Sequence, residues 1–246
     1  MTTKKKHDYF DVIDTEFKAY ILGWIYADGC LIPENGKRQG IFIISVQQND
    51  GEEFLPHLAQ EINGRNPSIR YYKSQIIRNE QPQMKVSISS NQIYKALVGY
   101  GLQSNKTING MSFPNIPKEL EHHFIRGFLD GDGSIIYTQT ISTYQPKTKP
   151  KTNKLRDRGR IAFTGTDIKF LNELASKLPI TKTYIGQKTK NLTTYILWIE
   201  RALDVRATLE YLYKDAIWFL SRKREKAIKI ISSEALCKHK DRSETT

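Results

Sequence analysis

The sequence predicts an α+β protein made of two pseudo-symmetric halves, each with the element order α-β-β-α-β-β-α. Two observations lead to this fold class. A nine-residue motif at 21–29 returns at 125–133, and the same succession of apolar patterns follows each copy. An irregular stretch rich in Asn and Pro, residues 101–117, separates the two copies. Internal duplication at this length favours pseudo-two-fold symmetry, with helices packed over antiparallel sheets.

Both motifs have the pattern of the last turns of an apolar helix, which a glycine ends one residue after an aspartate. Each motif has two small residues four positions apart, Gly23 with Ala27 and Gly127 with Gly131. Positions i and i+4 share one face of a helix. Small residues at that spacing let two backbones approach closely. Packing the two helices through these faces would bring the two motif aspartates together.

The first half is predicted over residues 14–100, after a loose basic tail at 1–13. Asp14 or Thr15 can cap its motif helix. The later elements are assigned to β-prone runs bounded by turn residues and to apolar residues at helical spacing. They are strands at 30–32 and 41–46, a helix at 50–62, strands at 67–75 and 84–89, and a helix at 92–100.

The second half is predicted over residues 118–231, between the linker at 101–117 and a frayed tail at 232–246. Its elements are a helix at 119–132, strands at 134–137 and 161–164, a helix at 168–178, strands at 184–187 and 195–200, and helices at 202–213 and 218–231. This half is about a dozen residues longer before its second helix. The added residues belong to the basic stretch 138–159, which we expect to be mobile without nucleic acid and to bind phosphates.

The composition favours a polyanionic partner. Lys and Arg number 38 against 26 Asp and Glu, a formal net charge of +12. Two distant cysteines, Cys30 and Cys237, indicate neither a disulfide framework nor a zinc site. A reducing compartment is therefore expected. No apolar run is long enough to span a membrane, so we expect no membrane partner.

The two nonapeptides, ILGWIYADG and IRGFLDGDG, resemble the LAGLIDADG motif of the homing endonucleases. Tyr26 stands where the consensus has its first aspartate, and Arg126 where it has an alanine. The resemblance covers residues 14–231. It implies a monomer whose two sheets form a DNA-binding saddle along the major groove. The implied activity is site-specific, staggered cleavage of both DNA strands across the minor groove.

Asp28 and Asp132 are the expected catalytic and metal-binding residues. A carboxylate at the C-terminal end of a helix opposes the helix dipole, and two carboxylates side by side repel each other. Divalent cations would offset both effects and could promote phosphodiester hydrolysis. The resemblance implies Mg²⁺, which Mn²⁺ can replace, and adds the carbonyls of Ala27 and Gly131 as ligands. Asp130 is interpreted as structural or surface-exposed.

Lys106 and Lys223 each closely follow the helix that ends one half. The resemblance implies a basic residue there that orients water and stabilises charge on the phosphate. An ordinary solvated or phosphate-contacting lysine is an equally open interpretation. Gln48, near the end of a strand, aligns with a water-positioning site of the family. We place its counterpart in the second half at Thr164.

Basic and amide side chains on or beside the predicted hairpins are the candidates for DNA contact. They are Lys37, Arg38, Arg70, Lys73, Gln75, Arg78, Gln83, Lys85, Lys147, Lys149, Lys151, Lys154, Arg156, Arg158, Arg160, Lys182, Gln187, Lys188 and Lys190. Most contacts should go to phosphates, and the glutamines are the possible base readers.

The function indicated is a metal-dependent homing endonuclease that acts on double-stranded DNA. Two alternatives remain open, an RNA-binding maturase that helps a host intron fold and a DNA-binding regulator without cleavage. Retention of both motif aspartates disfavours the regulator. The expected location is the nucleoid of a prokaryotic or phage-infected cell, or the matrix of an organelle that encodes the protein.

Overall fold

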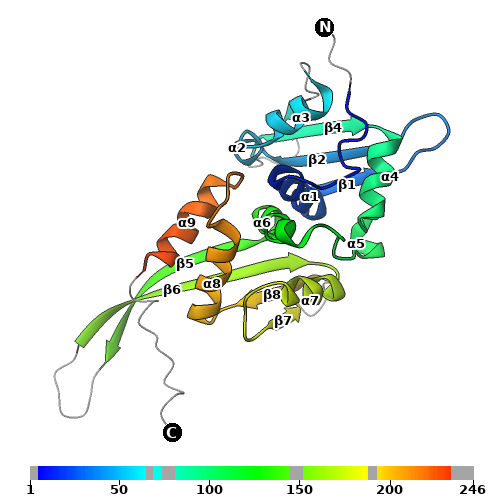
Figure 1. The fold of residues 1–246 in the computed structure, drawn as a ribbon. Coiled ribbons are helices and arrows are strands. Elements are labelled where there is room, and N and C mark those ends of the chain that lie inside the picture. The colour runs from blue at the N-terminus through cyan, green and yellow to red at the C-terminus, as the bar shows by residue number, and fades with distance from the viewer. Residues whose placement is uncertain (1–4, 65–68, 74–80, 145–151, 188–192, 234–246) are drawn as a thin grey trace.

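The computed structural model describes residues 5–64, 69–73, 81–144, 152–187 and 193–233, with side chains left out at 107, 142–144 and 152–156. The predicted fold class is confirmed. The two motif helices lie side by side at the centre, with one half of the molecule on either side (Figure 1). None of the helices in the described ranges has the length and apolar character that a membrane crossing requires.

The first half has the expected order of elements. They are α1 (Glu16–Asp28), β1 (Gly29–Ile32), β2 (Ile41–Gln47), α2 (Gln48–Gly51), α3 (Leu55–Asn63), β3 (Ile69–Tyr72), β4 (Gln83–Ser89) and α4 (Asn91–Gly99). Thr15 caps α1 by accepting a hydrogen bond from the backbone N–H of Lys18. The predicted helix at 50–62 is split into α2 and α3. Pro56, in the first turn of α3, lacks the N–H that a continuous helix would need there.

The second half repeats this order without a counterpart of α2 and with a second helix at its end. Its elements, with the two short connecting helices, are α5 (Lys106–Asn109), η1 (Lys118–Leu120), α6 (Glu121–Asp132), β5 (Ser134–Tyr144), β6 (Thr152–Gly165), α7 (Ile168–Ser176), β7 (Tyr184–Gln187), β8 (Tyr195–Ile199), α8 (Ala202–Tyr213) and α9 (Ser221–Ile231). The last helix begins at Ser221 rather than at Trp218.

Each half contains an antiparallel four-stranded sheet, ordered β1-β2-β4-β3 in the first and β5-β6-β8-β7 in the second. Residues of β2 and β4 alternate between buried and partly exposed, as one covered face requires. Phe42, Ile44 and Val46 face the helices, whereas Ile43 and Ser45 face away. We call the side away from the helices the open face of each sheet.

The expected contact between small residues of the motif helices is confirmed. A Cβ built on Gly127 would lie 2.0 Å from the carbonyl oxygen of Tyr20, and one on Gly23 would lie 2.1 Å from that of Phe124. A Cβ on Gly131 would lie 2.3 Å from the Cβ of Ala27. Even a methyl group therefore cannot enter this contact, which we call the seam.

One hydrophobic core runs across both halves. Trp24 of α1 stacks on Phe54 of its own half, with ring centroids 4.5 Å apart. Tyr26, on the same helix, stacks on Phe170 of the second half at 5.7 Å. The expectation of a loose tail at 1–13 is wrong for its later part, because Tyr9, Phe10 and Ile13 are buried in this core. Apolar side chains there give the segment a packing role that its basic start conceals.

The basic stretch 138–159 is not an irregular insertion. The strands β5 and β6 stay paired from Ser134 opposite Ala162 out to Tyr144 opposite Thr152. The two strands form a ribbon that extends beyond the rest of the protein (Figure 1). Helix α9 supports its base, since the side chain of Ile230 packs where a Cβ on Gly159 would otherwise lie. Thr-rich alternation in 138–144 suits a strand, which explains the order that composition alone did not indicate.

Candidate active site

Asp28 and Asp132 lie at the C-terminal ends of the two packed motif helices, as predicted. Both side chains are exposed at the end of the seam. A Cβ on Gly131, the residue before Asp132, would lie 3.4 Å from the Oδ2 atom of Asp28. The two carboxylates thus come together from different halves, although 104 positions separate them in the chain.

Lys106 approaches the end of the first motif helix. Its Nζ atom donates to the carbonyl oxygens of Ile25 at 3.2 Å and Tyr26 at 2.6 Å, and also to that of Ala27. The last carbonyls of a helix lack partners within it and carry partial negative charge. The lysine satisfies these carbonyls from outside and places a positive charge beside Asp28.

Lys223 does the same for the second motif helix. Its Nζ atom donates to the carbonyl oxygens of Leu129 at 2.6 Å, Asp130 at 2.7 Å and Gly133 at 2.8 Å. An ammonium group has three N–H donors, so all of them are used within the protein. The side chain is buried. The structure therefore favours a helix-capping lysine over the solvated lysine that the sequence left open.

The electrostatics of the four groups are coupled. Loss of hydration, followed by the charge of Asp132, raises the pKa of Asp28 to about 6, whereas Lys106 and Lys223 oppose this rise. Loss of hydration also raises the pKa of Asp132, again against the two lysines. Burial lowers the pKa of Lys106 to about 8 and that of Lys223 to about 8. The two lysines thus partly offset the effect of burial on the pKa of both carboxyl groups.

The donor set suits a hard divalent cation. Mg²⁺ prefers carboxylate oxygens together with phosphate oxygens and water, and Asp28 and Asp132 present exposed carboxylates side by side. No cluster of three or more His, Cys, Asp or Glu side chains fit for a metal occurs in the described residues, so a cation held by the two aspartates would complete its coordination with water or phosphate oxygens. The carbonyl oxygen of Ala27, an expected ligand, already accepts a hydrogen bond from Lys106. The two aspartates are thus the better-supported ligands.

Gln48 begins helix α2 instead of ending the strand. Its Nε2 atom donates to Oε1 of Glu52 at 2.6 Å. The placement of its counterpart at Thr164 is wrong, because Gly29 pairs with Ile44 while Ser134 pairs with Ala162. The first sheet starts one residue after Asp28 and the second starts two residues after Asp132. Extending the second register by one residue puts Phe163 at the position of Ile44 and Thr164 at the position of Ser45. The turn α2 has no equivalent in the second half, and sequence offsets alone did not reveal this.

Asp130 is structural and fully buried, which excludes the surface position that we also considered. Its carboxylate accepts hydrogen bonds from the hydroxyls of Tyr20 at 3.0 Å and Tyr213 at 2.7 Å, and from the N–H of Leu220 at 2.9 Å. Burial raises its pKa, with Lys223 as the main opposing charge. The buried Asp130 is therefore not part of the exposed carboxylate pair formed by Asp28 and Asp132.

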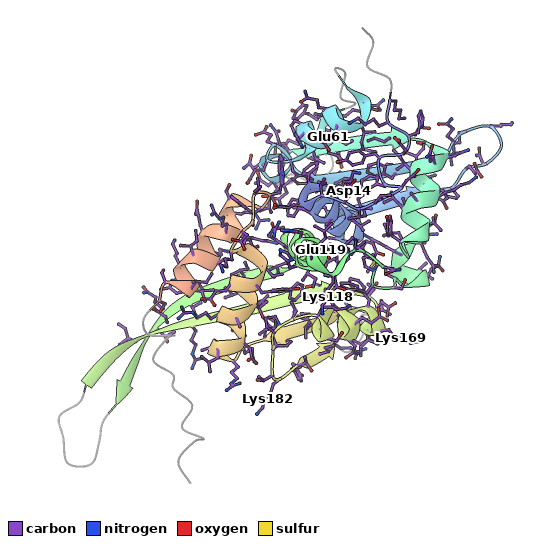
Figure 2. The ribbon with its side chains drawn as sticks, viewed as in Figure 1. Asp14, Glu61, Lys118, Glu119, Lys169 and Lys182 are labelled. Atoms are coloured by element: carbon purple, nitrogen blue, oxygen red, sulfur yellow. The ribbon has the colours of Figure 1, made fainter. Side chains whose placement is uncertain are left out.

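Only part of the predicted DNA-contact set can be placed on the open faces. Arg70 and Lys85 are register partners on the open face of the first sheet. Arg158 and Arg160 face the same way from β6, opposite Thr138 and Ile136. The remaining described candidates on loops are exposed, and Figure 2 shows Lys182 at the outer edge of the second half.

Gln187 is placed differently from the expectation. It pairs with Tyr195, two residues from the buried Leu197, and so belongs to the side of the sheet that faces the helices. Gln83 is opposite Gln47 and Tyr72 on the open face of the first sheet. The candidates that lie outside the described residues are Gln75, Arg78, Lys147, Lys149, Lys151, Lys188 and Lys190. The side chains of Lys154 and Arg156 are likewise outside the description.

Two ion pairs that join the halves were missed by the sequence analysis. Arg126, fully buried, binds Oε1 of Glu16 at 2.7 Å and also donates to the carbonyl oxygens of Leu212 and Trp218. Arg222 binds Asp50 through two hydrogen bonds, at 2.8 and 2.6 Å. The first ion pair could have been suspected from the sequence, where Arg126 replaces the alanine of the motif consensus. A charged residue on an apolar helix needs a partner.

The fold was compared with known proteins. No protein-family model matches the sequence, and neither does any curated protein. A lysine-to-alanine mutant of I-SmaMI superposes with a TM-score of 0.57 at 14% identity, covering 91% of this chain and 94% of that one. The I-SmaMI LAGLIDADG homing endonuclease bound to cleaved DNA gives a TM-score of 0.54 at 15% identity, covering 92% and 94%.

Two further structures add a second protein and a cation. Variants of the homing endonuclease I-DmoI give a TM-score of 0.52 at 16% identity, covering 82% of this chain and 97% of that one. I-SmaMI bound to an uncleaved DNA target in the presence of calcium ions gives 0.51 at 14%, covering 84% and 86%. Coverage of nearly the whole chain, together with the two motifs at the seam, shows that this chain has the LAGLIDADG homing endonuclease fold.

Proposed function

We propose that the protein is a monomeric, site-specific endonuclease that binds double-stranded DNA and cuts both strands by metal-dependent hydrolysis. The observation that carries this proposal is the pair of exposed carboxylates, Asp28 and Asp132, contributed by two helices in direct backbone contact at the seam. Like charges held together at helix ends are unfavourable in the free protein. Such a placement makes sense where a cation and a phosphate bind.

A divalent cation bound by Asp28 and Asp132 would stabilise the developing charge on the oxygens of the phosphodiester. Mg²⁺ is the proposed ion, with Mn²⁺ as a substitute. The protein fixes the positions of the two aspartates. Lys106 and Lys223 satisfy the last carbonyls of the motif helices, which fixes the backbone of each aspartate. Because their donors are used internally, we assign the lysines an electrostatic effect on the scissile phosphate rather than direct proton transfer.

The open faces supply the DNA-binding surface in this proposal. Antiparallel sheets fit the major groove, where the pattern of donors and acceptors distinguishes all four base pairs. Arg70, Lys85, Arg158 and Arg160 would bind phosphates or guanine edges from these faces. The structures of I-SmaMI with DNA support the same mode, since their fold covers nearly all of this chain. The long ribbon would extend the contact beyond the sheet of the second half.

The test begins with a target, which selection from a randomised DNA library can supply. Asp28→Asn and Asp132→Asn keep the shape of the side chain and remove its charge. Each should reduce double-strand cleavage by at least about a hundredfold, as loss of a transition-state contact does. DNA affinity should stay equal or rise, because a negative group facing phosphate is gone. Ca²⁺, with its looser geometry, should give a bound but uncut complex.

Asp215→Asn is the matched control, because Asp215 is exposed and its charge acts on His122, at the opposite end of α6 from Asp132. It should cut like the parent. Full activity of Asp132→Asn would refute the proposal. Binding without any cleavage by the parent protein would instead favour the regulator. Rescue of intron splicing that survives both substitutions would favour the maturase.

A further inference from the structure

The residue two positions before each motif aspartate is Tyr26 in α1 and Asp130 in α6. Both side chains are fully buried at 0% exposure, so neither can touch DNA or a cation. Their chemistry differs, yet the structure gives them corresponding partners. Each one binds the chain segment that carries the lysine of its own half.

Tyr26 holds the segment around Lys106. Its single O–H lies between two acceptors, the carbonyl oxygen of Tyr100 at 2.5 Å and that of Ser112 at 3.0 Å. These two carbonyls flank Lys106 on both sides in the chain. The tyrosine ring is fixed by edge contact with Phe124 at 4.9 Å. One rigid side chain of the motif helix thus fastens both ends of the segment.

Asp130 holds the segment before Lys223. One carboxylate oxygen accepts from the hydroxyl of Tyr213, at the end of α8, and the other accepts from the N–H of Leu220. Leu220 is the N-cap of α9, and its carbonyl oxygen accepts from the N–H of Lys223 at 3.0 Å. The carboxylate therefore fixes the first turn of the helix on which the lysine lies.

We infer that Tyr26 and Asp130 are positioning residues, each of which sets the place of the lysine at the end of its own motif helix. The chemistry explains why the two motifs differ at this position. The segment around Lys106 offers carbonyl oxygens, which need a donor, and tyrosine supplies a hydroxyl. The segment before Lys223 offers a hydroxyl and an N–H, which need an acceptor, and aspartate supplies a carboxylate.

Trace labelling with acetic anhydride, read by mass spectrometry, tests this without DNA. Tyr26→Phe keeps the ring and removes the hydroxyl. Lys106 should then react about five- to tenfold faster relative to Lys223, the factor expected when one or two ordinary hydrogen bonds are lost. Tyr9→Phe is the matched control, because it removes a buried hydroxyl of the same half that binds Glu61 at 2.5 Å. It should leave the ratio unchanged.

The reciprocal variant is Tyr213→Phe, which removes one donor from Asp130 and is milder than changing the buried carboxylate itself. It should raise the labelling of Lys223 and leave that of Lys106 unchanged. Labelling ratios equal to the parent in both variants would overturn the inference. So would a parallel rise at both lysines in each variant, because that pattern indicates general loosening rather than positioning.

The effect on catalysis rests on the proposed function and forms a separate readout. On a supercoiled plasmid carrying the target, Tyr26→Phe should slow one strand more than the other, so that nicked circles accumulate. Equal slowing of both strands would overturn the catalytic part of the inference. If the parent does not cut at all, the proposed function fails, while the labelling result still decides whether Tyr26 positions Lys106.

Discussion

The seam gives the sharpest test of how the two halves are joined. In Gly127→Ala the new Cβ would lie 2.0 Å from the carbonyl oxygen of Tyr20, whereas an ordinary contact is at least 3.4 Å. The obstacle is backbone, so the helices must separate by about 1.4 Å, and a gap of 0.5–1 Å already forfeits a quarter to a half of each contact's dispersion energy. We expect a loss of about 3 kcal/mol, at the upper end of ordinary overpacking.

Thermal unfolding followed by circular dichroism measures this loss. For a chain of this size, about 3 kcal/mol lowers the Tm by roughly 6–12 °C. Gly99→Ala is the control, since nothing lies within 4 Å of its added Cβ at the end of α4. It should be neutral or stabilise by up to about 1 kcal/mol, because alanine favours helix more than glycine does. Equal melting of the two variants would refute the account of the seam.

Three further predictions concern charged groups. The pKa of Asp28 is raised from 3.8 to about 6 in the folded state, so ionisation of this carboxyl group lowers the free energy of unfolding as the pH rises through that interval. Asp28→Asn should therefore raise the Tm of the metal-free protein at pH 8 but not at pH 3.5. Glu16→Ala removes the carboxylate that pairs with the buried Arg126 and should cost about 3–5 kcal/mol by urea unfolding, unlike Glu119→Ala in the exposed helix η1 (Figure 2). Replacing the lysines of residues 145–151 by Gln should flatten the salt dependence of DNA binding, and an unchanged slope would place the ribbon away from DNA.

Those parts of the fold that depend on local pattern could be predicted from the sequence. The motif helices, the order of strands and the seam follow from apolar spacing, turn residues and small residues at i and i+4. The split between α2 and α3 and the length of the ribbon could not. The split reflects the missing N–H of Pro56, which the continuous apolar spacing of 50–62 did not reveal. The length of the ribbon depends on strand pairing supported by Ile230 of a distant helix.

The same distinction applies to the candidate site. Asp28 and Asp132 were predictable because both occur in repeated motifs. The helix-capping geometry of Lys106 and Lys223 was not, because it depends on carbonyl groups about 80 to 90 positions earlier in the chain. The sequence left open whether Asp130 is structural or surface-exposed, because nothing in it pairs Asp130 with Tyr213 or Leu220. Tertiary hydrogen bonds between distant segments leave no periodic signal.

The energetics of the site link these features. Two carboxylates at helix ends repel each other, and the simplest relaxation would be for the helices to move apart. Moving apart would forfeit the packing of the seam, where Gly23 and Gly127 let the two backbones lie in direct contact. Rotation of the helix ends is opposed by Lys106 and Lys223, which bind three carbonyls each. The repulsion between the two carboxylates is therefore retained in the folded protein. Under the proposed function a bound cation would relieve it, which is the condition for a preorganised site.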